Sequence, residues 1–234
     1  MGRDKFSSLL RRNNLLIRQS GRRARMTDSK HWLKKYPNLV KLVEVTKSHE
    51  IWVSDITCIS TKRGFSYLSL ITDAYSRKIV GYYLSRDLRN TGSLEALKIA
   101  IRTNWRAGKQ LIHHSDRGVQ YCSWDYVEML RSHEILVSMT ENGDPYENAI
   151  AERVNGVLKA EFGLAAVFED HDAAELAVAR SVAIYNLKRP HSSCDYLTPA
   201  EAHEAEPGTL KRRWKSYYKK KPKTEYDKAV ASCS

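Results

Sequence analysis

Three consecutive β-branched runs constrain the fold of this chain more strongly than any other feature. They occupy residues 51–60, 65–75 and 78–85, and short breaks at 62–64 and 76–77 separate them. Runs of this length and composition are typical of strands, and breaks this short join antiparallel neighbours. We therefore expect the folded part of the chain to begin with a three-stranded antiparallel meander.

After residue 85 the pattern alternates between helix and strand. The order is helix, strand, helix, strand, helix, at residues 93–105, 110–116, 124–134, 135–140 and 147–162. Three antiparallel strands followed by this order form the arrangement of the ribonuclease H fold. We expect an α/β protein with a ribonuclease H-like, mixed five-stranded sheet flanked by helices. A small basic helical N-terminal segment, a late helix and a basic C-terminal tail complete the expected fold.

The three elements that each supply one acid in this fold all carry one here. Asp55 lies inside the first strand, Asp116 ends the fourth, and Glu152 lies in the helix after the fifth. Three carboxylates brought together repel one another unless cations lie between them, and Mg²⁺ prefers oxygen ligands. We predict that these acids are catalytic and hold two Mg²⁺ ions, which Mn²⁺ can replace, in a phosphoryl-transfer site. The alternative for Asp55 is an edge strand that turns its carboxylate to water.

The helix that contains Glu152 has a polar face. Asn148, Glu152, Asn155 and Lys159 follow one another at spacings of four, three and four residues, so they share one side of the helix. This stripe can face the catalytic site, or it can be an ordinary solvated face, which is the simpler interpretation for Lys159 alone. Residues 144–147 have the form of a capping box, although the helix can instead begin one turn later.

Other polar residues near the acids receive structural predictions. Asp73 lies at a turn after the second strand, where Asp commonly accepts hydrogen bonds from backbone amides. His113 is expected to pack in the core, and His114 to lie at the rim of the site. The four cysteines form no closely spaced pair, so neither a zinc site nor a disulfide framework is predicted.

Positive charge is concentrated at the two ends of the chain. The net charge is +12, and residues 1–50 carry 13 Lys and Arg against four Asp and Glu. Residues 207–234 carry nine against two, whereas the stretch between them carries 17 against 21. Basic segments suit phosphate backbones and an acidic centre suits divalent metal, although a single charge run is usually solvated surface.

These patterns divide the chain into three predicted parts. Residues 1–48 form a basic DNA-binding remnant and linker, residues 49–206 a catalytic core with a C-terminal helical extension, and residues 207–234 a basic tail. Within the first part, residues 5–17 have the pattern of the last helix of a helix-turn-helix unit. Three arginines of the linker are predicted to lie along a DNA backbone, namely Arg22, Arg23 and Arg25.

No apolar run in the sequence approaches the length that spans a bilayer. We therefore expect no membrane partner. The expected location is the cytoplasm of a prokaryotic cell, in association with the nucleoid.

Five separated blocks of the sequence resemble one family. The blocks are WVSDIT, YLSLITDAYSRKIVGYYLS, HHSDRGVQY, SMTENGDPYENAIAERVNGVLKAEF and YNLKRPHSSCDYLTPAEA. In this order they resemble the OrfB transposases of the insertion-sequence-three family, which share the DDE catalytic core of retroviral integrases. The resemblance covers roughly residues 30–203. It implies that Asp55, Asp116 and Glu152 are the metal-binding catalytic acids.

The resemblance also implies contacts with DNA. It places Lys159 at the DNA end near the active site, and the other predicted DNA-binding residues of the core are Asn148, Asn155 and Arg189. The family's C-terminal motif corresponds here to Tyr185, Asn186, Arg189 and His191.

Two positions beside the acids depart from the family pattern. Glu147 stands where Asp is more frequent, which keeps a carboxylate at the predicted capping position. Arg153 stands where Ser is more frequent, which adds a positive charge next to Glu152.

The expected function is that of a DNA transposase that cleaves insertion-sequence ends and transfers the strands to a target. Its expected partners are both DNAs, further copies of the chain and the product of an upstream small reading frame. Family members carry a helical DNA-recognition domain before the position of Arg3, so an N-terminally truncated, catalytically silent fragment that modulates full-length transposase is the alternative. A ribonuclease H or junction resolvase is a third hypothesis, against which the HHSDRG and RPH blocks argue.

Overall fold

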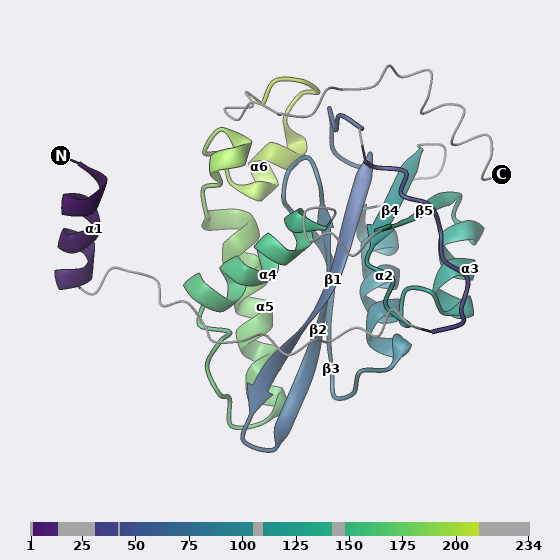
Figure 1. Ribbon diagram of the computed structural model, residues 1–234, viewed down its shortest axis with the longest axis horizontal. Coiled ribbons are helices and arrows are strands. Elements are labelled where there is room, and N and C mark those ends of the chain that lie inside the picture. Colours follow the sequence, from purple (N-terminus) through teal and green to yellow (C-terminus); the bar gives the residue numbers. More distant parts are fainter. Residues whose placement is uncertain (1, 14–30, 42, 105–109, 142–147, 211–234) are drawn as a thin grey trace.

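A five-stranded mixed sheet forms the centre of the protein (Figure 1). The computed structural model describes residues 2–13, 31–41, 43–104, 110–141 and 148–210. The strands are β1 (Ile51–Thr61), β2 (Gly64–Asp73), β3 (Ile79–Ser85), β4 (Leu111–Ser115) and β5 (Ile135–Met139). They lie in the order β3-β2-β1-β4-β5, with β1, β2 and β3 antiparallel and β4 and β5 parallel to β1. The predicted meander and fold class are confirmed.

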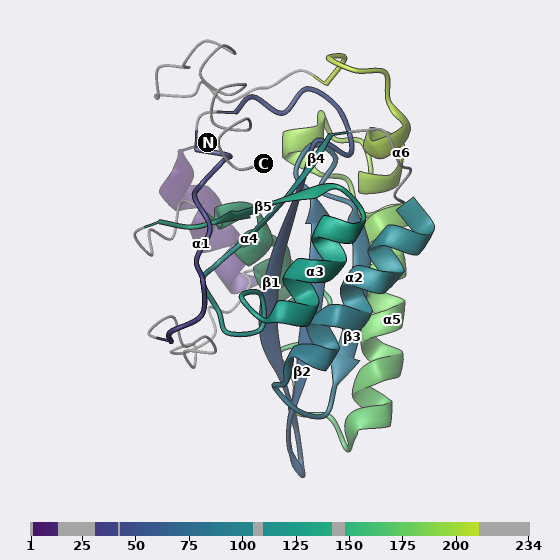
Figure 2. The same cartoon turned by 90° about the vertical axis from the view of Figure 1, so that its right-hand side faces the viewer.

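Helices cover both faces of this sheet (Figures 1 and 2). The helices α2 (Asn90–Asn104) and α3 (Trp124–Ser132) pack on one face, and α4 (Ala149–Glu161) and α5 (His171–Lys188) pack on the other. Two apolar cores pack on the sheet, one on each side, and a third, smaller cluster contains Leu39, Ile51, Val53, Ala74, Ile112 and Ala151. The polypeptide then continues through a short 3₁₀ turn (Ser192–Cys194) to α6 (Pro199–Glu204).

Alternate side chains of strand β1 enter the two cores on either side of the sheet. Trp52 and Ile56 belong to the α2/α3 core, whereas Ile59 belongs to the α4/α5 core. Because successive side chains of a strand alternate between faces, Asp55 shares the face of Ile59 and points toward α4. Since β1 is the central strand, the edge-strand alternative for Asp55 is wrong.

The sequence did not predict α6, although its start carries a clear signal. Thr198 is the N-cap, its hydroxyl accepts a hydrogen bond from the Glu201 amide, and the Glu201 carboxylate accepts one from the Thr198 amide. Pro199 occupies the first helical position. A reciprocal capping box with proline at this place favours a helix start strongly, even though the helix is only six residues long.

The N-terminal helix α1 (Arg3–Arg12) stands apart from the sheet in Figure 1. Phe6 and Leu9, two apolar residues of this helix, are each 49% exposed. The rest of the predicted helix-turn-helix and linker, including Arg22, Arg23 and Arg25, lies outside the described residues. Among the described helices, none is both long and apolar enough to cross a membrane.

Candidate active site

Parallel pairing of β1 and β4 brings Asp55 and Asp116 to one place. The two strands pair as far as Val53 and His114, and each acid lies two residues beyond this last pair. Residues two apart on a strand point to the same face, so both carboxylates continue the face that α4 covers. Strand β4 ends at Ser115 while β1 continues, so the two acids lie where these strands part.

Helix α4 brings Glu152 to the same region through two asparagines. The Asn148 side-chain amide donates to the carbonyl oxygen of Ser54 at 3.0 Å, and that of Asn155 donates to Asp55 Oδ2 at 2.8 Å. Glu152 lies between them on the same helix face, and it is therefore directed toward β1. The described helix begins after Asn148 as its N-cap. The capping box predicted at 144–147 lies outside the described residues.

The three acids influence one another electrostatically. Burial is the largest cause that raises the pKa of the Asp55 carboxyl to about 7, and the negative charges of Asp116 and Glu152 raise it further. The hydrogen bonds from Asn155 and from the backbone of Ile56 act in the opposite direction. A carboxyl whose pKa is raised by burial and by neighbouring acids is typical of functional sites.

The chemistry of these donors fits a hard divalent cation. All three are carboxylates, the ligand type that Mg²⁺ prefers, and Asp116 Oδ1 is held by the backbone amide of Gly118 at 3.0 Å. Within the described ranges, no three His, Cys, Asp or Glu side chains are close enough together to hold an ion. The acids converge on one region of the sheet, and their pairwise charges act on Asp55.

Comparison with known proteins identifies the family of this chain. The family described as Integrase core domain matches residues 45–145, and a second family of that description matches residues 133–199. The Insertion element IS600 uncharacterized 31 kDa protein of Shigella sonnei is 34% identical over 206 residues, which cover 87% of this chain and 75% of that protein. Transposase InsF for insertion sequence IS3A of Escherichia coli (strain K12) is 31% identical over 196 residues, which cover 82% and 67%.

The chain belongs to the insertion-sequence-three family of DNA transposases.

A solved structure agrees with the fold of this transposase. The HTLV-2 integrase catalytic core domain in complex with magnesium has a TM-score of 0.54 and 20% identity, and the match covers 68% of this chain and 98% of that domain. At this identity the likeness concerns the fold alone. It confirms the integrase-type, ribonuclease H-like architecture expected from the sequence.

Several residues predicted to bind DNA have partners inside the transposase. Asn148 and Asn155 donate to β1, as described above. Arg189 donates from Nε and Nη2 to the two carboxylate oxygens of Glu161, at 2.6 and 2.7 Å. Sequence reasoning placed these three side chains against DNA and missed their protein partners. Lys159 is half-buried on α4, and its contact with DNA stays a prediction.

The two histidines of β4 are both buried, on opposite faces of the sheet. The prediction for His113 is confirmed, since its Nε2 lies 2.6 Å from Ser54 Oγ and 2.9 Å from the Tyr126 hydroxyl. Burial lowers the pKa of His113 to about 3. His114 is fully buried and its Nδ1 lies 2.8 Å from Ser138 Oγ, so its predicted place at the site rim is wrong.

Asp73 has the structural role that the sequence predicted. Its Oδ2 accepts the backbone amide of His49 at 2.7 Å, and its Oδ1 accepts those of Tyr75 and Ser76 at 3.0 and 2.9 Å. The carboxylate therefore fixes the turn after β2 and the approach to β1. All three described cysteines are free thiols.

Residues of the C-terminal motif connect α5 to β3 and to α4 through hydrogen bonds. Asn186 bonds both backbone groups of Ile79 at the start of β3, accepting at 2.9 Å and donating at 3.0 Å. Arg189 joins the end of α5 to the end of α4 through Glu161, and the Tyr185 ring is buried beneath. This motif thereby holds the helix that carries Glu152, a role that the sequence alone did not indicate.

Replacing Asn186 with Ala is expected to destabilise the protein by about 2 kcal/mol. The change removes two hydrogen bonds and leaves the backbone of Ile79 without those partners, and unmade hydrogen bonds of buried groups cost about this much. Urea unfolding measures the difference. Lys188→Ala, an exposed change two residues away, should stay within about 0.5 kcal/mol of the parent. Equal losses in the two variants would contradict the assigned role.

Replacing Asn155 with Ala is expected to move metal-dependent activity to higher pH. The Asn155 hydrogen bond lowers the pKa of Asp55, so its loss raises that pKa above about 7 and leaves less carboxylate for metal. At pH 7 the rate should fall about fivefold for a one-unit shift, with recovery in alkaline buffer. Asn148→Ala is the matched control, because Asn148 bonds a backbone carbonyl. The same pH shift in both variants would disprove this assignment.

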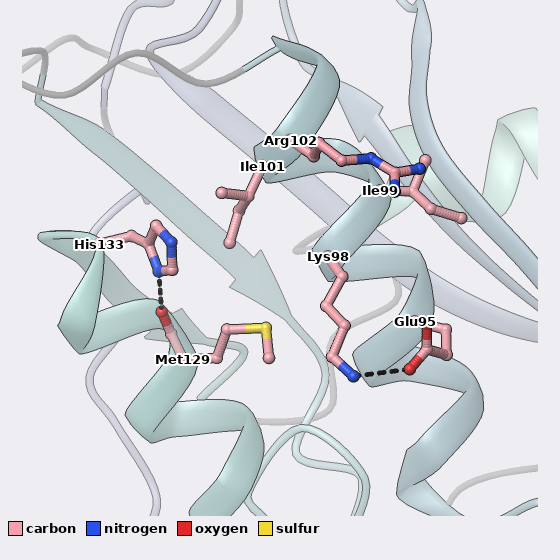
Figure 3. Close-up of a pocket in the computed structure, with 7 residues that line it drawn as sticks. All are labelled: Glu95, Lys98, Ile99, Ile101, Arg102, Met129 and His133. Atoms are coloured by element: carbon pink, nitrogen blue, oxygen red, sulfur yellow. Dashed lines mark hydrogen bonds and ion pairs between the residues drawn. The ribbon is translucent and has the colours of Figure 1, made fainter.

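A separate cavity lies on the other side of the sheet. Figure 3 shows it between α2 and α3, and its volume is about 570 Å³. Its lining residues are Glu95, Lys98, Ile99, Ile101, Arg102, Met129 and His133. Because Asp55 points toward α4, this cavity is not part of the candidate active site.

Proposed function

We propose that the chain cleaves DNA at the ends of an insertion sequence and joins the released 3′ ends to target DNA, with divalent metal. The observation that carries the proposal is the convergence of Asp55, Asp116 and Glu152, which the pairing of β1 with β4 and the contacts of α4 with β1 bring to one region. Two further findings support it. A relative is named as a transposase, and the integrase core of similar fold was solved in complex with magnesium.

The proposed roles of the acids follow from their positions. Asp55, Asp116 and Glu152 would together hold two Mg²⁺ ions, for which Mn²⁺ would substitute. Bound Mg²⁺ would supply Lewis acidity and lower the pKa of water. Asn155 orients Asp55 and the Gly118 amide orients Asp116. These carboxylates hold and orient, and none of them transfers a proton to DNA.

Two successive displacements at phosphorus account for the proposed reaction. In the first, water replaces the 3′ oxygen of the scissile phosphodiester and leaves a 3′-OH at the element end. In the second, this 3′-OH replaces the 3′ oxygen of a target phosphodiester, so one bond forms as one breaks. Neither displacement requires a covalent bond between the enzyme and DNA.

The proposal is tested with labelled DNA carrying the terminal repeats that flank the gene for this chain. With Mg²⁺, the expected products are a nicked end with a 3′-OH and a strand joined to target DNA. A chain that binds the ends without cutting them would contradict the proposed function and would favour a silent, modulating fragment.

The rest of the chain would serve DNA binding. The family acts on DNA in oligomeric assemblies, and we propose a homo-oligomer on DNA, associated with the nucleoid. Residues 1–48 and 207–234 would add salt-sensitive contacts to the phosphate backbone around the core at 49–206. Deletion of residues 211–234 should then reduce the salt dependence of DNA binding. The upstream reading-frame product stays a predicted partner, for which a co-purification experiment is the test.

A further inference from the structure

We propose that the indole of Trp32 stacks on an unpaired base of the DNA that the three acids act on. Trp32 lies in the segment formed by residues 31–41, which precedes β1 and which we call the strap. This inference rests on the proposed function, because it names the form of DNA end that the same site takes, one in which bases are released from their pairs.

The strap is held against the body of the protein. Leu33 and Tyr36 pack against the α2/α3 core. Farther along, the Leu39 amide donates to Ser138 Oγ of β5 at 2.9 Å. These contacts come from both halves of the strap, so its course beside β5 is defined by the fold.

The start of the strap is attached next to one of the acids. His31 Nε2 donates to the backbone oxygen of Arg117 at 2.9 Å. Arg117 directly follows Asp116, and Trp32 directly follows His31. This contact therefore sets the indole beside the place where β4 ends and the acids converge.

The side chain of Trp32 is directed into solvent although the residue beside it is packed. The indole is 92% exposed, whereas Leu33 is half-buried against the α2/α3 core. Burial of apolar area stabilises a fold, and tryptophan carries more of this area than leucine. Single exposed apolar residues are common on protein surfaces, but this one is fixed next to the acids, where a ligand accounts for its exposure.

Positive charge surrounds Trp32 on the side of the acids. Lys35 is exposed on the strap. Burial, followed by the charge of Asp116, raises the pKa of the Cys122 thiol to about 11, and the charges of Lys35 and Arg117 act on it in the opposite direction. All three charges thus act at one place. Cations that attract the backbone, together with an aromatic ring that stacks on a base, are the combination that binds single-stranded nucleic acid.

An unpaired base is the ligand that matches this ring. A base within a duplex is stacked on its neighbours, so a side chain reaches its face only where the base has left the stack. Every base has such a face, and the contact therefore gives little sequence preference. Successive nucleotides of a strand are about 3.4 Å apart along the duplex axis. An opened base a few positions from a scissile phosphate at the acids would therefore lie near Trp32.

The test compares Trp32→Ala with Trp124→Ala, which removes another exposed tryptophan at the start of α3. Binding is measured by fluorescence anisotropy in a metal chelator, which prevents cutting. The two probes are labelled element ends of equal length, one fully paired and one with its last few base pairs replaced by mismatches. We expect the parent to prefer the mismatched end. Trp32→Ala should bind that end about tenfold more weakly, with less than about a twofold change for the paired end.

Two further variants complete this comparison. Trp32→Phe keeps an aromatic face and should keep most of the preference for the mismatched end. Trp124→Ala should bind both ends as the parent does. Thermal unfolding checks that the folds are intact, which the exposure of both tryptophans favours.

The proposal is overturned by a parent without preference for the mismatched end, by a preference that survives in Trp32→Ala, or by equal losses in the two alanine variants. A changed mass in light scattering with unchanged DNA binding would also overturn it, because the indole would then contact another copy of the chain. Strand transfer by the parent with Mg²⁺ is measured separately. A parent that transfers strands although Trp32→Ala keeps the preference disproves the stacking contact alone. A parent that prefers mismatched ends through Trp32 but does not cut disproves the proposed reaction alone.

Discussion

Replacing Glu152 with Gln is expected to lower DNA cleavage and strand transfer together by at least about 1,000-fold, equivalent to about 4 kcal/mol of transition-state stabilisation. Glutamine keeps the size of the side chain and removes the charge that a hard cation needs. The same loss is expected for Asp116→Asn and Asp55→Asn. Both reactions are measured on labelled element ends with Mg²⁺.

The matched control for this series is Glu175→Gln. Glu175 is an exposed acid on α5, so its replacement removes one negative charge without touching the site, and full activity is expected. If any one of the three acids can be neutralised while strand transfer proceeds at the parent rate, that acid does not bind the catalytic metal. A loss of cleavage with unchanged strand transfer would show that the two reactions use different sites.

Replacing Asp55 with Asn is expected to stabilise the metal-free protein by about 4 kcal/mol at pH 8. The pKa of Asp55 is raised from 3.8 to about 7 in the folded chain. Its stabilising contribution is therefore complete below pH 4 and is lost as the pH rises through 7, where the buried carboxyl must ionise. Asparagine stays neutral throughout, and its side-chain oxygen can still accept the hydrogen bond from Asn155.

Thermal unfolding in a metal chelator at pH 5 and pH 8 measures this effect. The advantage of Asp55→Asn should be less than half as large at pH 5 as at pH 8. Added Mg²⁺ should narrow it, because a cation compensates the charge of the parent site. An advantage that does not change with pH would attribute the effect to packing and would contradict the electrostatic cause. The expected gain illustrates that a charged site is retained at the cost of stability.

Local sequence patterns predicted most of the strands and helices of the fold. The three β-branched runs and the later alternation correspond to β1 to β5 and to α2, α3 and α4, because the periods of apolar residues report directly which face of an element is buried. The order of those elements also indicated which three acids belong together. Asp55 stood out as a candidate because a carboxylate within an apolar strand is costly unless it is paired or binds a metal.

The sequence alone did not predict contacts between residues that lie far apart along the chain. The polar face of α4 was predicted, but the partners of Asn148 and Asn155 depend on β1, which lies about 100 residues earlier. The pair of Arg189 with Glu161 depends in the same way on how α5 packs beside α4. Spacing along the chain carries no information about such contacts. The start of α6 is different, since its capping box is local and was overlooked.

The attachment of α4 to α5 changes how intact copies of a mobile element should be recognised. All three acids are encoded before residue 153, so a gene copy with a premature stop shortly after Phe162 would still carry every one of them. Its product would lack Asn186 and Arg189, which fasten the C-terminal part to β3 and to α4. A census of genomes that counts copies by their acids alone would therefore include decayed genes among the active ones, and the end of α5 is the better marker.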